Sequence, residues 1–242
     1  MGLAGMKIAV LLRGISYTEP NNKELVEPCT GKSYKSLKVD FFSGPSASFV
    51  EHLYEPLVKA GHELTLYLST YDSKKLSKII EFLETTCGSK IKVVLMDPKT
   101  TTSQMQTVKA GLQLIEPCDY VISTRPDIIY KKPVTDINMN FDNLFFLFRD
   151  KYWDKWKIVG DVFFGFPYKW NQIMMDACDD VIEGRNLAVQ GSFHFIAVAF
   201  TQRLIEVYGE EVAAKQAWYF ATDRIYSSAG PNPFIQLQRD KG

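Results

Sequence analysis

The sequence has no excess charge of either sign and no clustered metal-binding side chains. Lysine plus arginine and aspartate plus glutamate each number 28, so the formal net charge is zero. A protein that coats nucleic acid needs clustered positive charge, so nucleic acid is not expected as a partner. The four cysteines are scattered, with no CxxC pair and no cysteine–histidine ligand spacing. This pattern argues against structural zinc and is typical of reduced thiols in a cytosolic protein.

Long hydrophobic runs and several familiar motifs are also missing. No stretch is long and apolar enough to span a membrane. The opening "MGLAGMKIAVLLRG" has too short an apolar run for a signal peptide, and it ends in Arg13 and Gly14 rather than at a cleavage site. The absence of GxGxxG, GxxxxGK[ST] and GxSxG argues against a dinucleotide fingerprint, a P-loop and a serine hydrolase with a nucleophile elbow.

What is present is an alternation of strand-like and helix-like segments. Hydrophobic residues make up 46% of the chain, enough for a sizeable core. The alternation predicts an α/β fold, with a mostly parallel sheet flanked by helices. We expect one domain over 1–242, with a nucleotide-type half at about 6–133 and a second half at about 134–242. The expected strands cover 7–14, 63–70, 90–97 and 119–130, and the expected helices cover 46–63, 73–88 and 102–118.

Polar residues follow the expected strands, where α/β sheets bind their ligands. Gly14 would let a ligand approach the backbone closely, although a lone glycine is also an ordinary turn residue. Tyr71 would stack on a base, and Asp72 would accept a hydrogen bond from a ribose hydroxyl or a base N–H. The same two residues also fit the start of the helix that follows.

The segment "TRPD" places charge inside an apolar, strand-like run. Arg125 and Asp127 are two residues apart, so they share one face of a regular strand. Asp127 is a candidate ligand for Mg²⁺ or Mn²⁺ holding a diphosphate. Arg125 would either grip phosphate directly or pair with Asp127. A purely structural Arg–Asp pair that closes a turn is the alternative.

Two residues of the second half complete the candidates. Asp161, in "VGDVFFGFP", lies between apolar runs, where burial would raise its pKa and suit it to act as a general base. A structural role for Asp161 is equally open. His194, in "QGSFHFIAV", fits a buried core histidine or a late ligand for the same metal as Asp127.

The motifs "VISTRPDIIY" and "GDVFFGFP" resemble those of GT-A nucleotide-sugar glycosyltransferases, in particular short enzymes of bacterial lipopolysaccharide synthesis and of large DNA viruses of algae. The resemblance implies a GT-A-like, Rossmann-related fold. That family usually holds its metal with Asp-x-Asp, whereas here Arg125 stands first and only Asp127 matches. The resemblance also implies that the nucleoside is held after the first strand by Leu12, Arg13 and Gly14 and after the second by Thr70, Tyr71 and Asp72. It further implies that an acidic acceptor-side residue is the base.

These observations together predict a glycosyltransferase that moves a sugar from a UDP-sugar to a glycan acceptor with Mn²⁺ or Mg²⁺. We expect it in the cytoplasm, or in the host cytoplasm if the source is viral. The expected roles are catalytic base for Asp161, donor binding for Arg13, Gly14, Tyr71, Asp72 and Arg125, and metal binding for Asp127 and His194. A nucleotidyltransferase that makes sugar nucleotides and a non-catalytic nucleotide- or carbohydrate-binding module are the alternatives.

Overall fold

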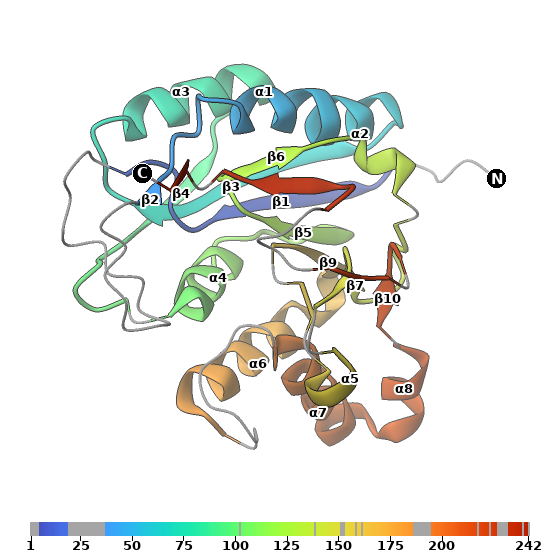
Figure 1. Cartoon of the computed structure of the whole chain (residues 1–242). Coiled ribbons are helices and arrows are strands. Elements are labelled where there is room, and N and C mark those ends of the chain that lie inside the picture. The colour runs from blue at the N-terminus through green and yellow to red at the C-terminus, as the bar shows by residue number, and fades with distance from the viewer. Residues whose placement is uncertain are drawn as a thin grey trace.

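A seven-stranded sheet runs through the middle of the molecule (Figure 1). Its strand order is β10-β7-β9-β5-β1-β3-β4. The computed structural model describes residues 5–18, 37–101, 103–137, 139–150, 153–157, 159–160, 162–185, 195–216, 218–222, 224–226, 232–238 and 240–241. The sheet strands are β1 (Lys7–Arg13), β3 (Glu63–Tyr71), β4 (Lys92–Met96), β5 (Tyr120–Thr124), β7 (Phe145–Phe146), β9 (Phe163–Pro167) and β10 (Tyr219–Phe220).

The sheet is mostly parallel, as the sequence predicts. Strand β1 pairs in parallel with β3 on one side and with β5 on the other, and β3 pairs in parallel with β4. Only β9 runs the opposite way, antiparallel to both β5 and β7. The chain therefore builds outward from β1 through β3 to β4 and then returns to build the other side from β5. The direction of sheet growth reverses between β1 and β5.

Helices cover both faces of the sheet (Figure 1). One face carries α1 (Pro45–Phe49), α2 (Glu55–Lys59) and α3 (Leu76–Cys87), and the other carries α4 (Gln104–Leu112), α6 (Asn171–Glu183) and α7 (Ile196–Tyr208). Alternate residues of β1 enter opposite cores, with Val10 among the first group of helices and Leu11 among the second. This two-sided burial explains why β1 reads as a continuous apolar run. The fold is a Rossmann-like α/β arrangement.

The first helical segment is not uniform. The sequence predicts one helix over 46–63, but a π-helical turn, Val50–Tyr54, separates α1 from α2. Pro56 follows this turn at the start of α2. Proline lacks an N–H and clashes with the preceding turn, and a π-bulge is one way in which a helix accommodates such a residue.

The expected strand over 119–130 is wrong in its second half. Strand β5 ends at Thr124, and the chain resumes as β6 (Ile128–Tyr130), which pairs antiparallel with β12 (Ile235–Leu237) outside the main sheet. Pro126 cannot donate a backbone hydrogen bond, so the ladder cannot continue through it. The C-terminal end of the chain thus lies beside the segment that follows β5.

The second half of the chain adds short strands and helices. These are β8 (Arg149–Asp150), α5 (Trp153–Trp156), α8 (Glu210–Lys215) and β11 (Ile225–Tyr226), and β2 (Leu37–Lys38) pairs with β13 (Asp240–Lys241). Asp150 is buried in β8. Within the parts of the chain listed above, no helix combines the length and apolar character needed to cross a membrane.

Candidate functional site

The carboxyl ends of β1, β3 and β5 meet at one edge of the sheet. Arg13 pairs with Ser69 of β3, and Leu12 pairs with Thr124 of β5, so the ends of these strands lie level. This edge also contains the point where sheet growth reverses, which is where open α/β sheets bind ligands. The structure thus brings Arg13, Gly14, Tyr71 and the start of the "TRPD" segment to the same edge.

Gly14 leaves β1 in a conformation that other residues rarely adopt, with φ of 106°. Its N–H donates to the Ser69 carbonyl (2.9 Å), and its own carbonyl accepts from Thr70 Oγ1 (2.8 Å). Thr70 Oγ1 also lies 3.0 Å from Ser16 Oγ. Among the described residues, a Cβ added at Gly14 would meet no atom within 4 Å. The loop is therefore fixed by polar contacts while its backbone borders open space that a ligand can enter.

Arg13 is a charged residue buried at the end of β1, with an exposed fraction of only 1%. Its Nη1 donates to Gln104 Oε1 at 3.1 Å. Gln104 is the first residue of α4, whose start is fixed by a capping box between Ser103 and Gln106. An arginine remains protonated when buried. Arg13 thus supplies positive charge at this edge, and the start of α4 holds its side chain in place.

A cluster beside β3 escaped the sequence analysis. Lys75 Nζ forms an ion pair with Asp40 (2.6 Å) and lies 4.6 Å from the centre of the Tyr17 ring. Tyr17 follows β1, and Lys75 follows Tyr71 and Asp72 of the β3 end. Tyr71 is half-buried and Asp72 is exposed. The three clustered residues come from separate loops, so no local pattern in the sequence reveals them.

Arg125 and Asp127 form a two-pronged ion pair. Nε and Nη2 of Arg125 donate to Oδ1 and Oδ2 of Asp127 at 2.8 and 2.7 Å. The exposed fractions of the two side chains are 10% and 1%. Of the two partners left open by the sequence for Arg125, the structure shows Asp127. Nearby, Thr124 Oγ1 contacts the Tyr130 hydroxyl at 2.5 Å, and burial raises the pKa of that hydroxyl, so Tyr130 stays neutral.

The described residues do not fit a divalent cation resident at Asp127. Both carboxylate oxygens already accept from Arg125, and a cation prefers the same oxygens. In the ranges that the structure covers, no three histidine, cysteine or acidic side chains gather into a possible metal site. His194 and Asp161 lie outside the described residues, so their assigned roles stay predictions.

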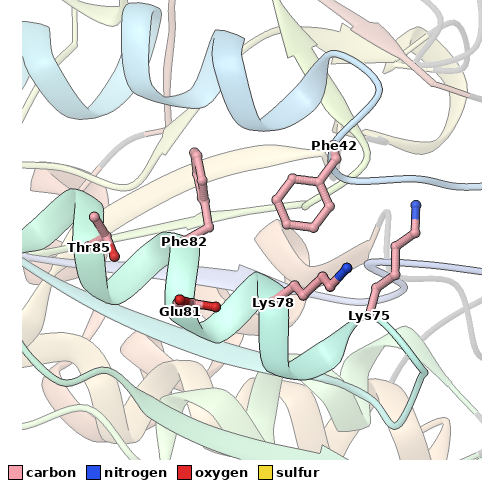
Figure 2. Close-up of a pocket in the computed structure, with 6 residues that line it drawn as sticks. All are labelled: Phe42, Lys75, Lys78, Glu81, Phe82 and Thr85. Atoms are coloured by element: carbon pink, nitrogen blue, oxygen red, sulfur yellow. The ribbon is translucent and has the colours of Figure 1, made fainter.

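An open groove of about 560 Å³ runs along α3, beside the loop that precedes α1 (Figure 2). The Phe42 ring, 38% exposed, meets the Phe82 ring edge to face, with centroids 5.9 Å apart. Lys75 belongs both to this groove and to the contact with Tyr17. The groove therefore extends from the loops at the carboxyl edge over the outer face of α3. Its lining residues are Phe42, Lys75, Lys78, Glu81, Phe82 and Thr85.

Aromatic residues of the second half divide into two groups. Phe163, Phe164 and Phe166 of β9 are fully buried and belong to the core. Beyond the end of β7, the Arg149 guanidinium lies over two half-buried rings, 5.1 Å from the centre of the Trp153 ring and 5.0 Å from that of Phe220. This cation–π cluster was not identified from the sequence, because its members come from three separate segments.

Comparisons with known proteins add little to this geometry. No protein-family model matches the chain, and no curated protein sequence matches it. Among solved structures, the chain is similar to the inositol-1-phosphate CTP transferase from T. maritima, with 11% identity and a TM-score of 0.46. The match covers 91% of this chain and 86% of that one. A likeness at this level supports no statement about activity.

Proposed function

We propose that this protein is a glycosyltransferase that moves a sugar from a nucleotide-sugar donor, such as a UDP-sugar, to a glycan acceptor. One observation carries the proposal. At the point where sheet growth reverses, the carboxyl edge combines an open, positive-φ glycine, Gly14, with the buried guanidinium of Arg13 and the oriented guanidinium of Arg125. Backbone approach and fixed guanidinium groups are what a diphosphate needs for tight, oriented binding.

The donor would lie across the ends of β1, β3 and β5. Its diphosphate would approach Gly14 and the guanidinium groups, while its nucleoside would extend toward Tyr71 and Asp72 at the end of β3. An exposed carboxylate and a half-buried aromatic ring suit a ribose hydroxyl and a base, respectively. This arrangement follows the general rule for ligands of open α/β sheets.

Glycosyl transfer would then proceed by displacement at the anomeric carbon. The acceptor hydroxyl forms the new glycosidic bond, the bond between the sugar and the diphosphate breaks, and the nucleoside diphosphate leaves with the electron pair. Arg13 and Arg125 would stabilise the negative charge that develops on the leaving group. Asp161 is proposed to take the proton from the acceptor hydroxyl.

The same phosphate contacts would also serve a nucleotidyltransferase, so the experiment must separate the two reactions. Calorimetric titration with UDP, GDP and CTP identifies the nucleotide. Incubation with the matching nucleotide sugar then releases the nucleoside diphosphate if the protein is a glycosyltransferase, because such enzymes slowly transfer the sugar to water. Incubation with the nucleoside triphosphate and sugar phosphates releases pyrophosphate if it is a nucleotidyltransferase. Binding without either product indicates a non-catalytic module.

A further inference from the structure

We propose that Asp127 is a positioning residue for Arg125 and that the donor diphosphate binds to arginine side chains without a divalent cation at Asp127. The inference rests on the proposed function, since it concerns how the donor is held. This role differs from that of the Asp-x-Asp motif in GT-A glycosyltransferases, where the carboxylates hold a metal ion.

The geometry of the Arg125–Asp127 ion pair is the first observation in favour of this role. Two parallel N–H···O contacts of 2.8 and 2.7 Å occupy one lone-pair direction on each carboxylate oxygen. The Asp127 side chain is 99% buried, so water does not compete for it. Bidentate, charge-assisted pairs of this kind are among the strongest side-chain contacts and fix the plane of the guanidinium. Asp127 therefore orients Arg125 before any ligand arrives.

A cation would have to use the one lone-pair direction left on each oxygen of a side chain that is 1% exposed, or displace Arg125. Mg²⁺ and Mn²⁺ bind carboxylate oxygens directly, and a guanidinium held against the same two oxygens repels them. If the pair opened, the Arg125 side chain, which is only 10% exposed, would lose its two-pronged contact with Asp127. Breaking a buried ion pair in this way is strongly unfavourable. Asp127 is thus committed to arginine.

The backbone around Asp127 is fixed as well. The Asp127 carbonyl accepts from the N–H of Gln238 (2.8 Å), next to β12, which pairs with β6. The Gln238 side-chain amide in turn donates to the Ser43 hydroxyl. Pro126 restricts φ immediately before Asp127. The segment that contains β12 and Gln238 therefore fixes the turn at Asp127. The geometry of the Arg125–Asp127 pair thus comes from the fold and not from a bound metal.

The two arginines would play different parts. Asp127 fixes the plane of the Arg125 guanidinium, so Arg125 would contribute oriented N–H donors. Arg13 is a buried guanidinium whose Nη1 donates to Gln104 Oε1, and it would add positive charge. A diphosphate needs both, namely directional donors to set its position and positive charge to offset its own. Guanidinium groups can therefore supply what a metal usually supplies.

The test uses UDP as the probe and isothermal titration calorimetry as the measurement. Wild-type protein is titrated in buffers that contain Mn²⁺, Mg²⁺ or EDTA, and the same affinity is expected in all three. Asp127→Asn keeps one acceptor oxygen for Arg125, whereas Arg125→Lys keeps the positive charge but loses the two parallel N–H donors of the guanidinium. Each substitution is expected to weaken UDP binding on the order of tenfold, as expected for a lost hydrogen bond to a charged group. The double variant should lose no more than either single one, because both break the same contact.

A second ion pair provides the control. Lys92 Nζ and Glu116 lie 2.6 Å apart at the opposite edge of the sheet, where β4 begins. Glu116→Gln should leave UDP affinity unchanged. An equal loss in this variant would show a general structural effect and overturn the proposal.

The remaining outcomes separate this inference from the proposed function. If UDP binds only with Mn²⁺ or Mg²⁺ and Asp127→Asn removes that dependence, the positioning role is refuted while the glycosyltransferase proposal stands. If the two single losses add in the double variant, Asp127 does not act through Arg125. If neither UDP nor another nucleoside diphosphate binds in any buffer, both proposals fail together.

Discussion

Thr70 Oγ1 donates a 2.8 Å hydrogen bond to the carbonyl of Gly14 and thereby joins the end of β3 to the loop that follows β1. The Gly14 N–H returns to β3 through the Ser69 carbonyl. Two consecutive residues of β3 thus hold Gly14, Ser69 at its N–H and Thr70 at its carbonyl. These two hydrogen bonds shape the carboxyl edge before any ligand is present, as expected for a preorganised binding site.

Substitution of Gly14 by alanine tests whether the backbone at Gly14 contributes to ligand binding. Gly14 has φ of 106°, and an added Cβ would meet no atom of the described part of the chain within 4 Å. The cost to folding should therefore come from backbone strain alone, about 1–2 kcal/mol. The Cβ would also occupy the space that the diphosphate is proposed to enter. We expect a lower melting temperature together with a loss of UDP affinity, measured by thermal unfolding and by calorimetry.

Gly61 provides a matched control for this substitution. It has φ of 92° and equally open surroundings, but it lies just before β3, at the opposite edge of the sheet. Gly61→Ala should lower the melting temperature to a similar extent and leave UDP affinity intact. If both variants lose affinity equally, Gly14 has no special place in ligand binding.

Much of the fold could be predicted from the sequence because its strands are short, apolar and followed by polar residues. β1, β3 and β4 lie where the apolar runs predicted them, and alternation with helices required a parallel sheet. The carboxyl-edge rule then brought Arg13, Gly14 and Tyr71 together before any coordinates were known. The break after Thr124 was missed, because the apolar residues on both sides of Pro126 read as one strand.

The candidate site was less predictable, because its partners are chosen in three dimensions. A carboxylate two residues from an arginine fits a salt bridge and a metal site equally well in sequence, and only the fold shows the side chains of Arg125 and Asp127 facing each other. The cluster of Tyr17, Asp40 and Lys75 joins loops that are far apart in sequence. Such contacts carry no local periodicity that a sequence reading could detect.

Substitution of Thr70 by valine tests the contact between β3 and Gly14 from the β3 side. Valine keeps the shape of the side chain but removes the contacts to Gly14 and Ser16. Thr70 is fully buried, so the Gly14 carbonyl and Ser16 hydroxyl would each lose a partner. We expect a fall in the free energy of unfolding of about 1–3 kcal/mol, measured by urea denaturation. UDP affinity should fall as well, because the loop after β1 would no longer be held.

The control for Thr70→Val is Thr86→Val in α3. Thr86 Oγ1 donates to the Phe82 carbonyl within the helix, away from the strand ends. Its loss should leave UDP affinity unchanged. Undiminished affinity in Thr70→Val would show that ligand binding does not depend on the hold that β3 has on Gly14.

His62 predicts a pH dependence of stability that is separate from the site. Its Nδ1 accepts the backbone N–H of Met6 at 3.3 Å, which requires an unprotonated nitrogen. Burial lowers the pKa of His62 below its ordinary value. As the pH falls below that ordinary value, about 6.5, the unfolded chain takes up a proton that the folded chain resists, so stability declines. Urea denaturation between about pH 7.5 and about pH 5.5 should show this decline, and His62→Gln should flatten it. An unchanged slope in His62→Gln would assign the pH dependence to other groups.

The proposed base, Asp161, can be separated from a donor-binding residue by the step that it affects. Asparagine is nearly the same size as aspartate but cannot take the proton from the hydroxyl of the glycan acceptor. Asp161→Asn should therefore lower turnover by about 100-fold or more. UDP affinity should stay at the wild-type value, because the donor would bind at the ends of β1, β3 and β5. Asp150→Asn, at a buried acidic position of β8 in the same half, is the comparison, and a smaller effect on turnover is expected there. The measurement is release of the nucleoside diphosphate under saturating donor, with calorimetry alongside. Wild-type turnover in Asp161→Asn together with a strong loss in Asp150→Asn would transfer the role of base to Asp150, a carboxylate that is buried at the end of β8.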